Sequence, residues 1–214
     1  MAGKHRKAHY TPHERQVLDA LEADLKAWMA DRPKRLAHSL SVAETAERLA
    51  LVYDVDPFMA RAAGILHDWD KRVSDDELVE RVRALGIEFL VDASEIKPLL
   101  HGIVAARELP ELYPDLPREV FQAIERHTTA AEDMTDLDMV VFIADGIEPL
   151  RKASEGIEKT RSLVGKVPLE ELFWISFVGG IVYVLEGGRY LYPGTLDIYN
   201  AIAKRRAAAA RDAR

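Results

Sequence analysis

In the sequence GILHDWDK at residues 64–71, a histidine–aspartate pair directly follows an apolar run. Asp56 and Pro57 upstream are typical of a helix N-terminus, and the helix that begins there reaches about Asp68. Neighbouring residues point roughly 100° apart around an α-helix, so His67 and Asp68 can share one ligand only where the helix ends. The pair therefore predicts a metal-binding position at a helix end.

Helical patterns continue on both sides of this stretch, beginning with apolar residues at helical spacing from Arg35 to Tyr53. Alternating β-branched stretches with hairpin turns are nearly absent. We therefore expect an all-α helical bundle. Further helices are predicted from the capping residue Ser74 to the stop at Gly86, from Pro98 to Leu109, from Pro117 to near His127, from Thr135 through Ile147, beyond Gly165, and after Pro193.

The length of 214 residues fits one domain. The boundaries we expect are a basic arm plus a helix at 1–32, the main helical domain at 33–201 and a basic, solvated tail at 202–214. The apolar run from Leu172 to Leu185 is shorter than a membrane span and contains two glycines, so we interpret it as a buried core helix. We expect no membrane partner.

The net charge of −7 argues against a general nucleic-acid binder, so no nucleic-acid partner is expected. The chain has no cysteine, which excludes disulfides and thiolate zinc sites. The basic N-terminus lacks the apolar stretch of a signal peptide, and a cytoplasmic location is expected.

Histidines supply the main functional signal. His5, His9 and His13 lie in the N-terminal segment, where we expect a disordered or surface arm. Taken singly, a histidine on an apolar helix face is usually part of the core, and a lone aspartate is usually a cap or half of an ion pair. Helices in a bundle can bring such side chains to one point, and a buried carboxylate is costly unless it is paired or binds a metal. The candidate metal ligands, spread over different predicted helices, are His38, His67, Asp68, His101, His127 and Asp145.

The order of these six residues resembles the HD superfamily in its six-ligand, two-metal version. The surrounding sequence resembles the bacterial YqeK family over about residues 33–201. The segments that carry the resemblance are RLAHSL at 35–40, GILHDWDK at 64–71, LHG at 100–102, AIERHTT at 123–129, ADGIEPLR at 144–151 and PGTL at 193–196.

The resemblance implies an HD-domain bundle that hydrolyses diadenosine tetraphosphate symmetrically into two ADP. It implies two divalent metal ions, with iron as the expected metal and manganese or cobalt as alternatives. Asp68 would bridge them, and a bridging hydroxide would attack a β-phosphorus. The resemblance assigns the remaining ligands as His38, His67 and Asp145 on one ion and His101 and His127 on the other.

Cationic and hydroxyl side chains near these ligands are candidates for binding phosphate. Lys71 and Arg151 follow ligands closely, so we expect them to act in catalysis and to bind substrate, although each could be a surface charge. Arg35, Thr128 and Thr129 are further substrate-binding candidates, and the two threonines could instead cap the next segment.

Three positions depart from the usual family pattern. Ala130 and Leu150 stand where glycines are usual, and Gly146 stands where an aromatic residue follows the ligand aspartate. These positions border the expected nucleotide pocket, so base and chain-length preference stay open. The six candidate ligands are unaffected.

Two other functions stay open at this point. One is another nucleotide hydrolase of the HD superfamily, such as a nucleotidase or a guanosine tetraphosphate hydrolase. The other is a nucleotide-binding regulator without turnover. A cyclic-dinucleotide phosphodiesterase of the HD-GYP kind is disfavoured because the chain has no Gly-Tyr-Pro. The oligomeric state is open between a monomer and a dimer.

Overall fold

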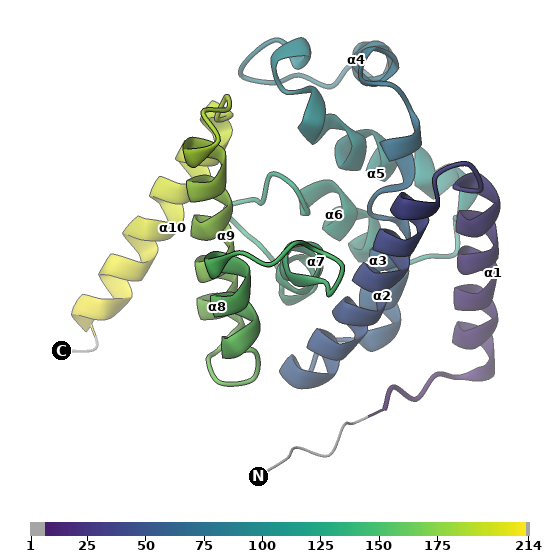
Figure 1. The fold of residues 1–214 in the computed structure, drawn as a ribbon, viewed down its shortest axis with the longest axis horizontal. Coiled ribbons are helices and arrows are strands. Elements are labelled where there is room, and N and C mark those ends of the chain that lie inside the picture. Colours follow the sequence, from purple (N-terminus) through teal and green to yellow (C-terminus); the bar gives the residue numbers. More distant parts are fainter. Residues whose placement is uncertain (1–6, 213–214) are drawn as a thin grey trace.

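The computed structural model describes residues 7–212, and every regular element within that range is a helix (Figure 1). The all-α prediction is therefore confirmed. The α-helices are α1 (Pro12–Trp28), α2 (Pro33–Tyr53), α3 (Pro57–Leu66), α4 (Asp75–Ala84), α5 (Leu100–Leu112), α6 (Arg118–Arg126), α7 (Asp136–Ile147), α8 (Glu155–Leu163), α9 (Leu169–Glu186) and α10 (Pro193–Asp212). Short 3₁₀ helices are η1 (Trp69–Arg72), η2 (Ala93–Glu95) and η3 (Lys97–Leu99).

Side-chain caps define where several helices begin. Asp56 accepts hydrogen bonds from the backbone of Phe58 and Met59 and starts α3, as predicted. Thr135 starts α7 with a reciprocal capping box to Asp138. The helix α3 ends at Leu66, so His67 occupies its C-cap and Asp68 lies in the turn beyond. The histidine–aspartate pair therefore sits at a helix end, as the sequence predicts.

The central helices pack closely around a single large core (Figure 1). α2 packs against α3 and α7, and α6 packs against α3, α5 and α7. Two glycines permit these approaches. A Cβ at Gly64 would lie 2.6 Å from the Cα of Ala43 in α2, and a Cβ at Gly102 would lie 2.7 Å from the Cε1 of His127. Only glycine lets α3 approach α2, and α5 approach α6, this closely.

The C-terminal region differs from the prediction of a buried core helix. Helix α9 buries only its first half, with Leu172, Phe173 and Phe177 in the core. In its second half, Tyr183 is 61% exposed and Leu185 59% exposed. The reason is visible in Figure 1, where α9 and α10 extend along one side of the bundle and the other helices cover only part of α9.

The basic C-terminal segment forms a helix whose end is exposed to solvent. α10 continues to Asp212, buries Ile202, and places Arg206 2.5 Å from Glu171 in α9. Residues 207–212 beyond these contacts are exposed. The helix α8 at 155–163, capped by Ser154, is not among the helices predicted from the sequence. His9 and His13 are exposed, and His5 lies outside the described residues.

Across residues 7–212, the helices lack the combination of length and apolar character that crossing a lipid bilayer requires.

Candidate metal centre

Six side chains from five helices and one turn meet at the centre of the bundle. The turn residue Asp68 lies in the middle, with a side chain only 5% exposed. The contributing positions are His38 on α2, His67 at the C-cap of α3, Asp68 in the turn, His101 on α5, His127 at the C-cap of α6 and Asp145 on α7. The structure thus brings together all six residues that the sequence nominates as ligands.

The two carboxylate oxygens of Asp68 face different histidines. Oδ1 lies 3.0 Å from Nε2 of His101, 3.8 Å from Nε2 of His67 and 3.9 Å from Nε2 of His127. Oδ2 lies 3.6 Å from Nε2 of His38. The oxygens of this one carboxylate therefore face histidines on both sides of the cluster.

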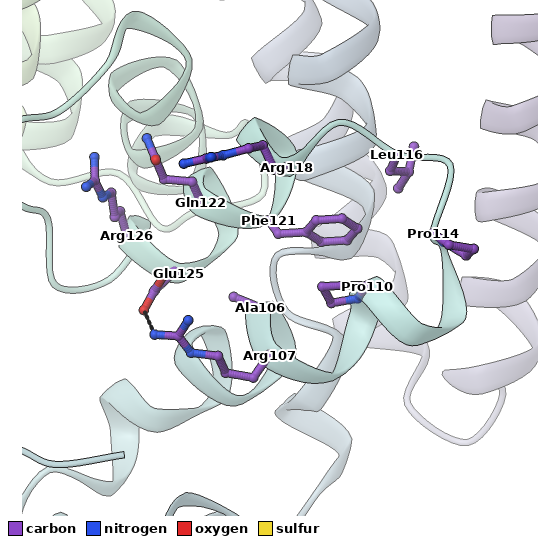
Figure 2. Close-up of a pocket in the computed structure, with 10 residues that line it drawn as sticks. All are labelled: Ala106, Arg107, Pro110, Pro114, Leu116, Arg118, Phe121, Gln122, Glu125 and Arg126. Carbon is purple, nitrogen blue, oxygen red and sulfur yellow. Dashed lines mark hydrogen bonds and ion pairs between the residues drawn. The ribbon is translucent and has the colours of Figure 1, made fainter. Parts of the chain in front are cut away.

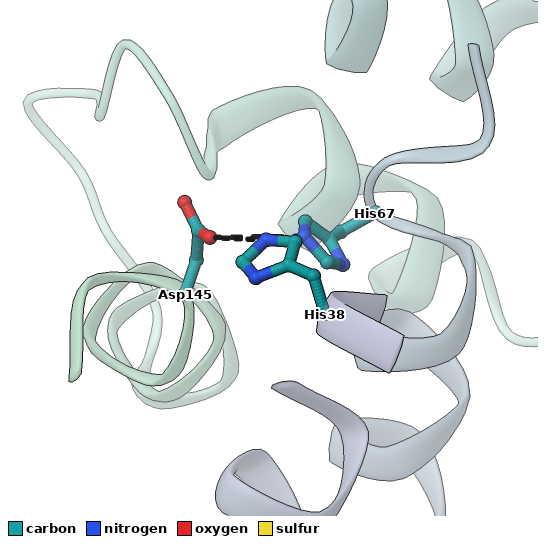
Figure 3. A group of neighbouring side chains, drawn as sticks. All are labelled: His38, His67 and Asp145. Carbon is teal, nitrogen blue, oxygen red and sulfur yellow. Dashed lines mark ion pairs between the residues drawn. The ribbon is translucent and has the colours of Figure 1, made fainter. Parts of the chain in front are cut away.

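A second grouping surrounds Asp145 (Figure 3). Its Oδ1 lies 3.0 Å from Nε2 of His38 and 3.8 Å from Nε2 of His67. The set of His38, His67 and Asp145 has ligand atoms within 4.8 Å of one another, and so does the set of His67, Asp68 and His127. Nitrogen and oxygen donors in this mixture suit divalent transition metals.

Every histidine of the cluster uses Nδ1 for a hydrogen bond away from the centre. The acceptors are the carbonyl of Gly64 for His67 at 2.7 Å, of Pro98 for His101 at 3.1 Å and of Ile124 for His127 at 2.6 Å. His38 instead bonds to the carboxylate of Glu148 at 3.0 Å. A carbonyl or carboxylate accepts a hydrogen bond, so each Nδ1 carries a proton, and Nε2 is the nitrogen that faces the centre and could bind a cation.

Some of the Nε2 atoms that face the centre are buried acceptors that a bound cation would satisfy. Nε2 of His67 is fully buried and has no hydrogen-bond partner within the described chain. Nε2 of His101 faces Nε2 of His127 at 3.1 Å, so two lone pairs point at each other. Buried acceptors of this kind cost free energy unless a proton or a metal satisfies them. The residues present therefore fit a divalent cation.

The pKa shifts favour an ionised Asp68 and neutral His101 and His127, whereas burial of His38 is outweighed by Asp145 and Glu148, which raise its pKa. Burial opposes ionisation of Asp68, but the neighbouring His67 and His101 outweigh it and hold the pKa of Asp68 well below its usual value. Burial, with the charges of His101 and His67, lowers the pKa of His127 to about 3. Burial likewise lowers the pKa of His101. Neutral imidazole and ionised carboxylate are the forms that bind metal.

Three cationic side chains surround the mouth of the cluster. Arg35 donates to Oδ2 of Asp68 at 3.1 Å and Arg151 donates to Oδ1 of Asp145 at 2.5 Å, so both contact the centre directly. Lys71 donates to the carbonyl of Pro98 at 3.2 Å. Burial lowers the pKa of Lys71, although Asp68 opposes the shift. We call Arg35, Lys71 and Arg151 the cationic rim.

The two threonines that are candidates for binding phosphate both donate to backbone carbonyls. Thr128 donates to the carbonyl of Leu99 at 3.5 Å, and Thr129 donates to the carbonyl of Ala130 at 3.2 Å. Ala130 itself is buried with φ at 60°, a left-handed conformation that favours glycine. The hydroxyl of Thr129 thus makes a local contact in this turn, whereas that of Thr128 reaches the distant Leu99 in η3.

Two buried carboxylates near the centre were missed by sequence reasoning. Glu148 bonds to the candidate ligand His38. In the sequence, however, a glutamate before a proline at a helix end is typical of an ordinary turn residue. Asp70 is 2% exposed, and its Oδ2 has no hydrogen-bond partner among the described residues. Burial, with the nearby charge of Glu108, raises the pKa of Asp70 to about 7. Nothing in the DWDK segment distinguishes Asp70 from a surface carboxylate.

A separate surface cavity of about 430 Å³ lies between α5 and α6 (Figure 2). Phe121 and Arg118 line it, and Arg107 forms an ion pair with Glu125 across it at 3.0 Å. The six candidate ligands are not among its lining residues. The cavity is therefore distinct from the centre.

Comparisons with known proteins agree with this architecture. The family described as the HD domain matches residues 35–150. A symmetrical bis(5'-nucleosyl)-tetraphosphatase of Staphylococcus aureus is 35% identical over 170 residues, which span 78% of this chain and 86% of that protein. One of Halalkalibacterium halodurans is 34% identical over 172 residues, which span 78% of this chain and 88% of that protein.

A solved structure shares the same fold. It is a predicted HD superfamily hydrolase involved in NAD metabolism from Clostridium acetobutylicum, 30% identical to this chain, with a TM-score of 0.77. The match covers 86% of this chain and 97% of that one. The chain therefore belongs to the HD-domain hydrolases, in the family of the symmetrical bis(5'-nucleosyl)-tetraphosphatases.

Proposed function

We propose that this protein hydrolyses diadenosine tetraphosphate symmetrically into two molecules of ADP. The observation that carries the proposal is the buried cluster around Asp68, with Nε2 of His67 unsatisfied at its centre. The S. aureus relative named for this reaction supports the substrate, since the similarity spans 86% of its length.

Asp68 is our candidate for a carboxylate shared by two cations, because its oxygens face both sides of the cluster. His38, His67 and Asp145 would hold one cation, and His101 and His127 the other. Bound divalent cations, for which iron is our expectation, would lower the pKa of a water and neutralise phosphate charge. The chain contributes neutral imidazoles and ionised carboxylates that are already oriented inward.

The cationic rim would orient the tetraphosphate chain. Water adds to one β-phosphorus, the bond from that phosphorus to the oxygen bridging the two β-phosphates breaks, and ADP leaves with that oxygen. Negative charge grows on the leaving phosphate, and Arg151, which contacts Asp145 at the edge of the centre, would stabilise it. Arg35 and Lys71 would bind the remaining phosphates. To bind the substrate, either arginine would leave its aspartate partner and bind a phosphate in its place.

A product assay tests this proposal directly. Protein purified anaerobically and reconstituted with Fe²⁺ or Mn²⁺ is incubated with diadenosine tetraphosphate, and the nucleotides are separated by chromatography. We expect ADP as the sole product. AMP together with ATP would contradict symmetrical cleavage, and an absence of turnover with either metal would favour a nucleotide-binding regulator.

Substrate range separates the proposal from other HD-domain hydrolases. Guanosine tetraphosphate and nucleoside monophosphates, assayed side by side at equal concentration, should be hydrolysed far more slowly than diadenosine tetraphosphate. Faster turnover of either compound would replace the proposed substrate. A Lys26→Gln variant, altered in an ion pair with Glu22 on α1 away from the centre, serves as the control and should retain full activity.

A further inference from the structure

Glu148 occupies an unusual position behind one candidate ligand. Its side chain is 2% exposed and lies just beyond the end of α7, only three residues after Asp145. Its Oε1 is 3.0 Å from Nδ1 of His38, which is on α2 and 110 positions earlier in the chain. The three other histidines of the cluster bond to a carbonyl three residues earlier in their own segment. His38 is therefore the member whose orientation depends on a distant side chain.

The carboxylate of Glu148 is itself held in place. Its Oε2 accepts a hydrogen bond from the backbone of Leu150 at 2.6 Å, and the hydroxyl of Ser41 also bonds to it. Arg161 donates to the carbonyl of Glu148 at 2.6 Å and to the carbonyl of Ile147 at 2.9 Å, which ties the end of α7 to α8. The carboxylate is fixed on the side of the ring that faces away from Asp68 and Asp145.

We infer that Glu148 is a positioning residue, which fixes the protonated Nδ1 of His38 and thereby presents Nε2 to a cation shared with His67 and Asp145. A carboxylate behind a ligating histidine selects the tautomer, limits ring rotation and increases the electron density on the inward nitrogen. The inference concerns the metal centre on which the proposed function rests, and it does not depend on which nucleotide is the substrate.

Glutamine at this position would test the chemistry with little change of shape. Two donors, Nδ1–H of His38 and N–H of Leu150, bond to the two separate oxygens of Glu148. A glutamine has one oxygen and one amide nitrogen, so it can accept from only one of these donors in this geometry. If the amide faces His38 it donates to Nδ1, and the ring proton moves to Nε2, where it blocks the cation.

The experiment measures Mn²⁺ binding to the metal-free protein by electron paramagnetic resonance. We expect Glu148→Gln to weaken the affinity of the cation that His38 contacts by about 10- to 100-fold. The effect should disappear in the His38→Ala background, where Glu148→Gln should change the affinity by less than about twofold. Wild-type Mn²⁺ affinity in Glu148→Gln would overturn the inference. An equal loss with and without His38 would also overturn it, because Glu148 would then act through the general fold.

Asp138 provides a matched control on the same helix. It is also a fully buried carboxylate and accepts from Arg126 at 2.8 Å and from the backbone of Thr135 at 2.9 Å, but it bonds to no histidine. Asp138→Asn should lower the thermal unfolding temperature while leaving Mn²⁺ affinity unchanged. A comparable loss of Mn²⁺ affinity in this variant would contradict a specific role for Glu148.

A measurement on the wild-type protein covers the case in which Glu148→Gln does not fold. In the Zn²⁺-loaded chain, ¹⁵N-labelled histidine resonances should show His38 protonated at Nδ1 and bound through Nε2. The opposite tautomer would overturn the inference. The outcomes also separate this inference from the proposed function. Weakened Mn²⁺ binding without hydrolysis of diadenosine tetraphosphate would reject only the function, and hydrolysis with unchanged Mn²⁺ binding would reject only the role of Glu148.

Discussion

The interior of the metal centre and its cationic rim are built in different ways. His67, His101 and His127 are at most 3% exposed, and backbone carbonyls fix each ring. On the rim, the side chains of Arg35 and Arg151 remain 48% and 42% exposed and each contacts one aspartate of the centre. Packing therefore determines the interior, whereas the rim is free to exchange partners. We expect substitutions in the interior to abolish metal binding and hydrolysis, and substitutions at the rim to reduce hydrolysis only in part.

Removal of the central carboxylate should have the largest effect. In Asp68→Ala, the residue facing four histidines is lost, so metal content and hydrolysis should both fall below detection, a loss of at least about 10⁴-fold. Far-ultraviolet circular dichroism should still show a helical protein. Metal analysis and the product assay measure the two losses, and activity near that of the wild type would show that Asp68 is not part of the centre.

Removal of a rim charge should separate substrate binding from metal binding. Arg151→Ala should keep its metal but lose about 10- to 100-fold in kcat/KM, because one cationic contact to the phosphate chain is lost. Arg151→Lys should recover part of that loss. If Arg151→Ala instead lost its metal, the rim and the interior would be one unit and the comparison would fail.

Asp70 is an interior carboxylate that contacts no ligand histidine, so it should affect stability without affecting metal binding. Its pKa is raised to about 7, which means that the folded chain binds a proton between pH 4 and 7 that the unfolded chain releases. Its contribution to stability is complete below about pH 4 and is lost as the pH rises through 7. Asp70→Asn should thus be more stable than the wild type at pH 8, on the order of 2 kcal/mol.

Urea unfolding at pH 5 and pH 8, with equal metal loading, measures this difference. The advantage of Asp70→Asn should be clearly smaller at pH 5. An advantage that is the same at both pH values would show that Asp70 does not hold its proton in the folded state.

The smallest effect on stability is expected for a substitution at Ala130, in the turn that follows the candidate ligand His127. Ala130 has φ at 60°, a conformation that is unfavourable for alanine by about 1 kcal/mol and accessible to glycine. Ala130→Gly should raise the free energy of unfolding by roughly 0.5 kcal/mol, since the added freedom of the unfolded chain offsets part of the relief. Thermal unfolding at a fixed Mn²⁺ concentration measures it. A loss of 1 kcal/mol or more would indicate that the buried methyl group matters more than the backbone.

The difference between interior and rim also explains what the sequence could predict. Ligand residues stand in short apolar segments on separate helices, so their convergence follows from helix packing. The contacts of Thr128 and Glu148 depend on how the turns that carry them fold back on the bundle. The periodic pattern of apolar residues does not predict the path of these turns. Asp70 is hidden for a similar reason, since η1 packs against the distant α5 and the charges of Glu108 and Arg81 that act on Asp70 come from other helices.

The C-terminal helices show the limit of hydropathy as a guide to burial. The run from Leu172 to Leu185 is apolar on all sides, which is typical of a buried helix. α7 and α8 pack against it and α10 lies alongside (Figure 1), yet Tyr183 and Leu185 stay exposed. Hydropathy indicates how favourable burial would be, but the number of neighbouring helices decides whether burial occurs.

Gly64 and Gly102 have a consequence for judging distant relatives. A chain could retain all six metal-binding side chains and still be unable to assemble them, because a single methyl group at either glycine would collide with the backbone of α2 or the ring of His127. A comparison of the metal-binding residues alone would indicate that the metal centre of such a chain is intact. Two positions should therefore be inspected in distant relatives: the glycine that follows the third histidine, and the glycine three residues before the histidine–aspartate pair. They help to distinguish relatives that can assemble the metal centre from relatives that cannot.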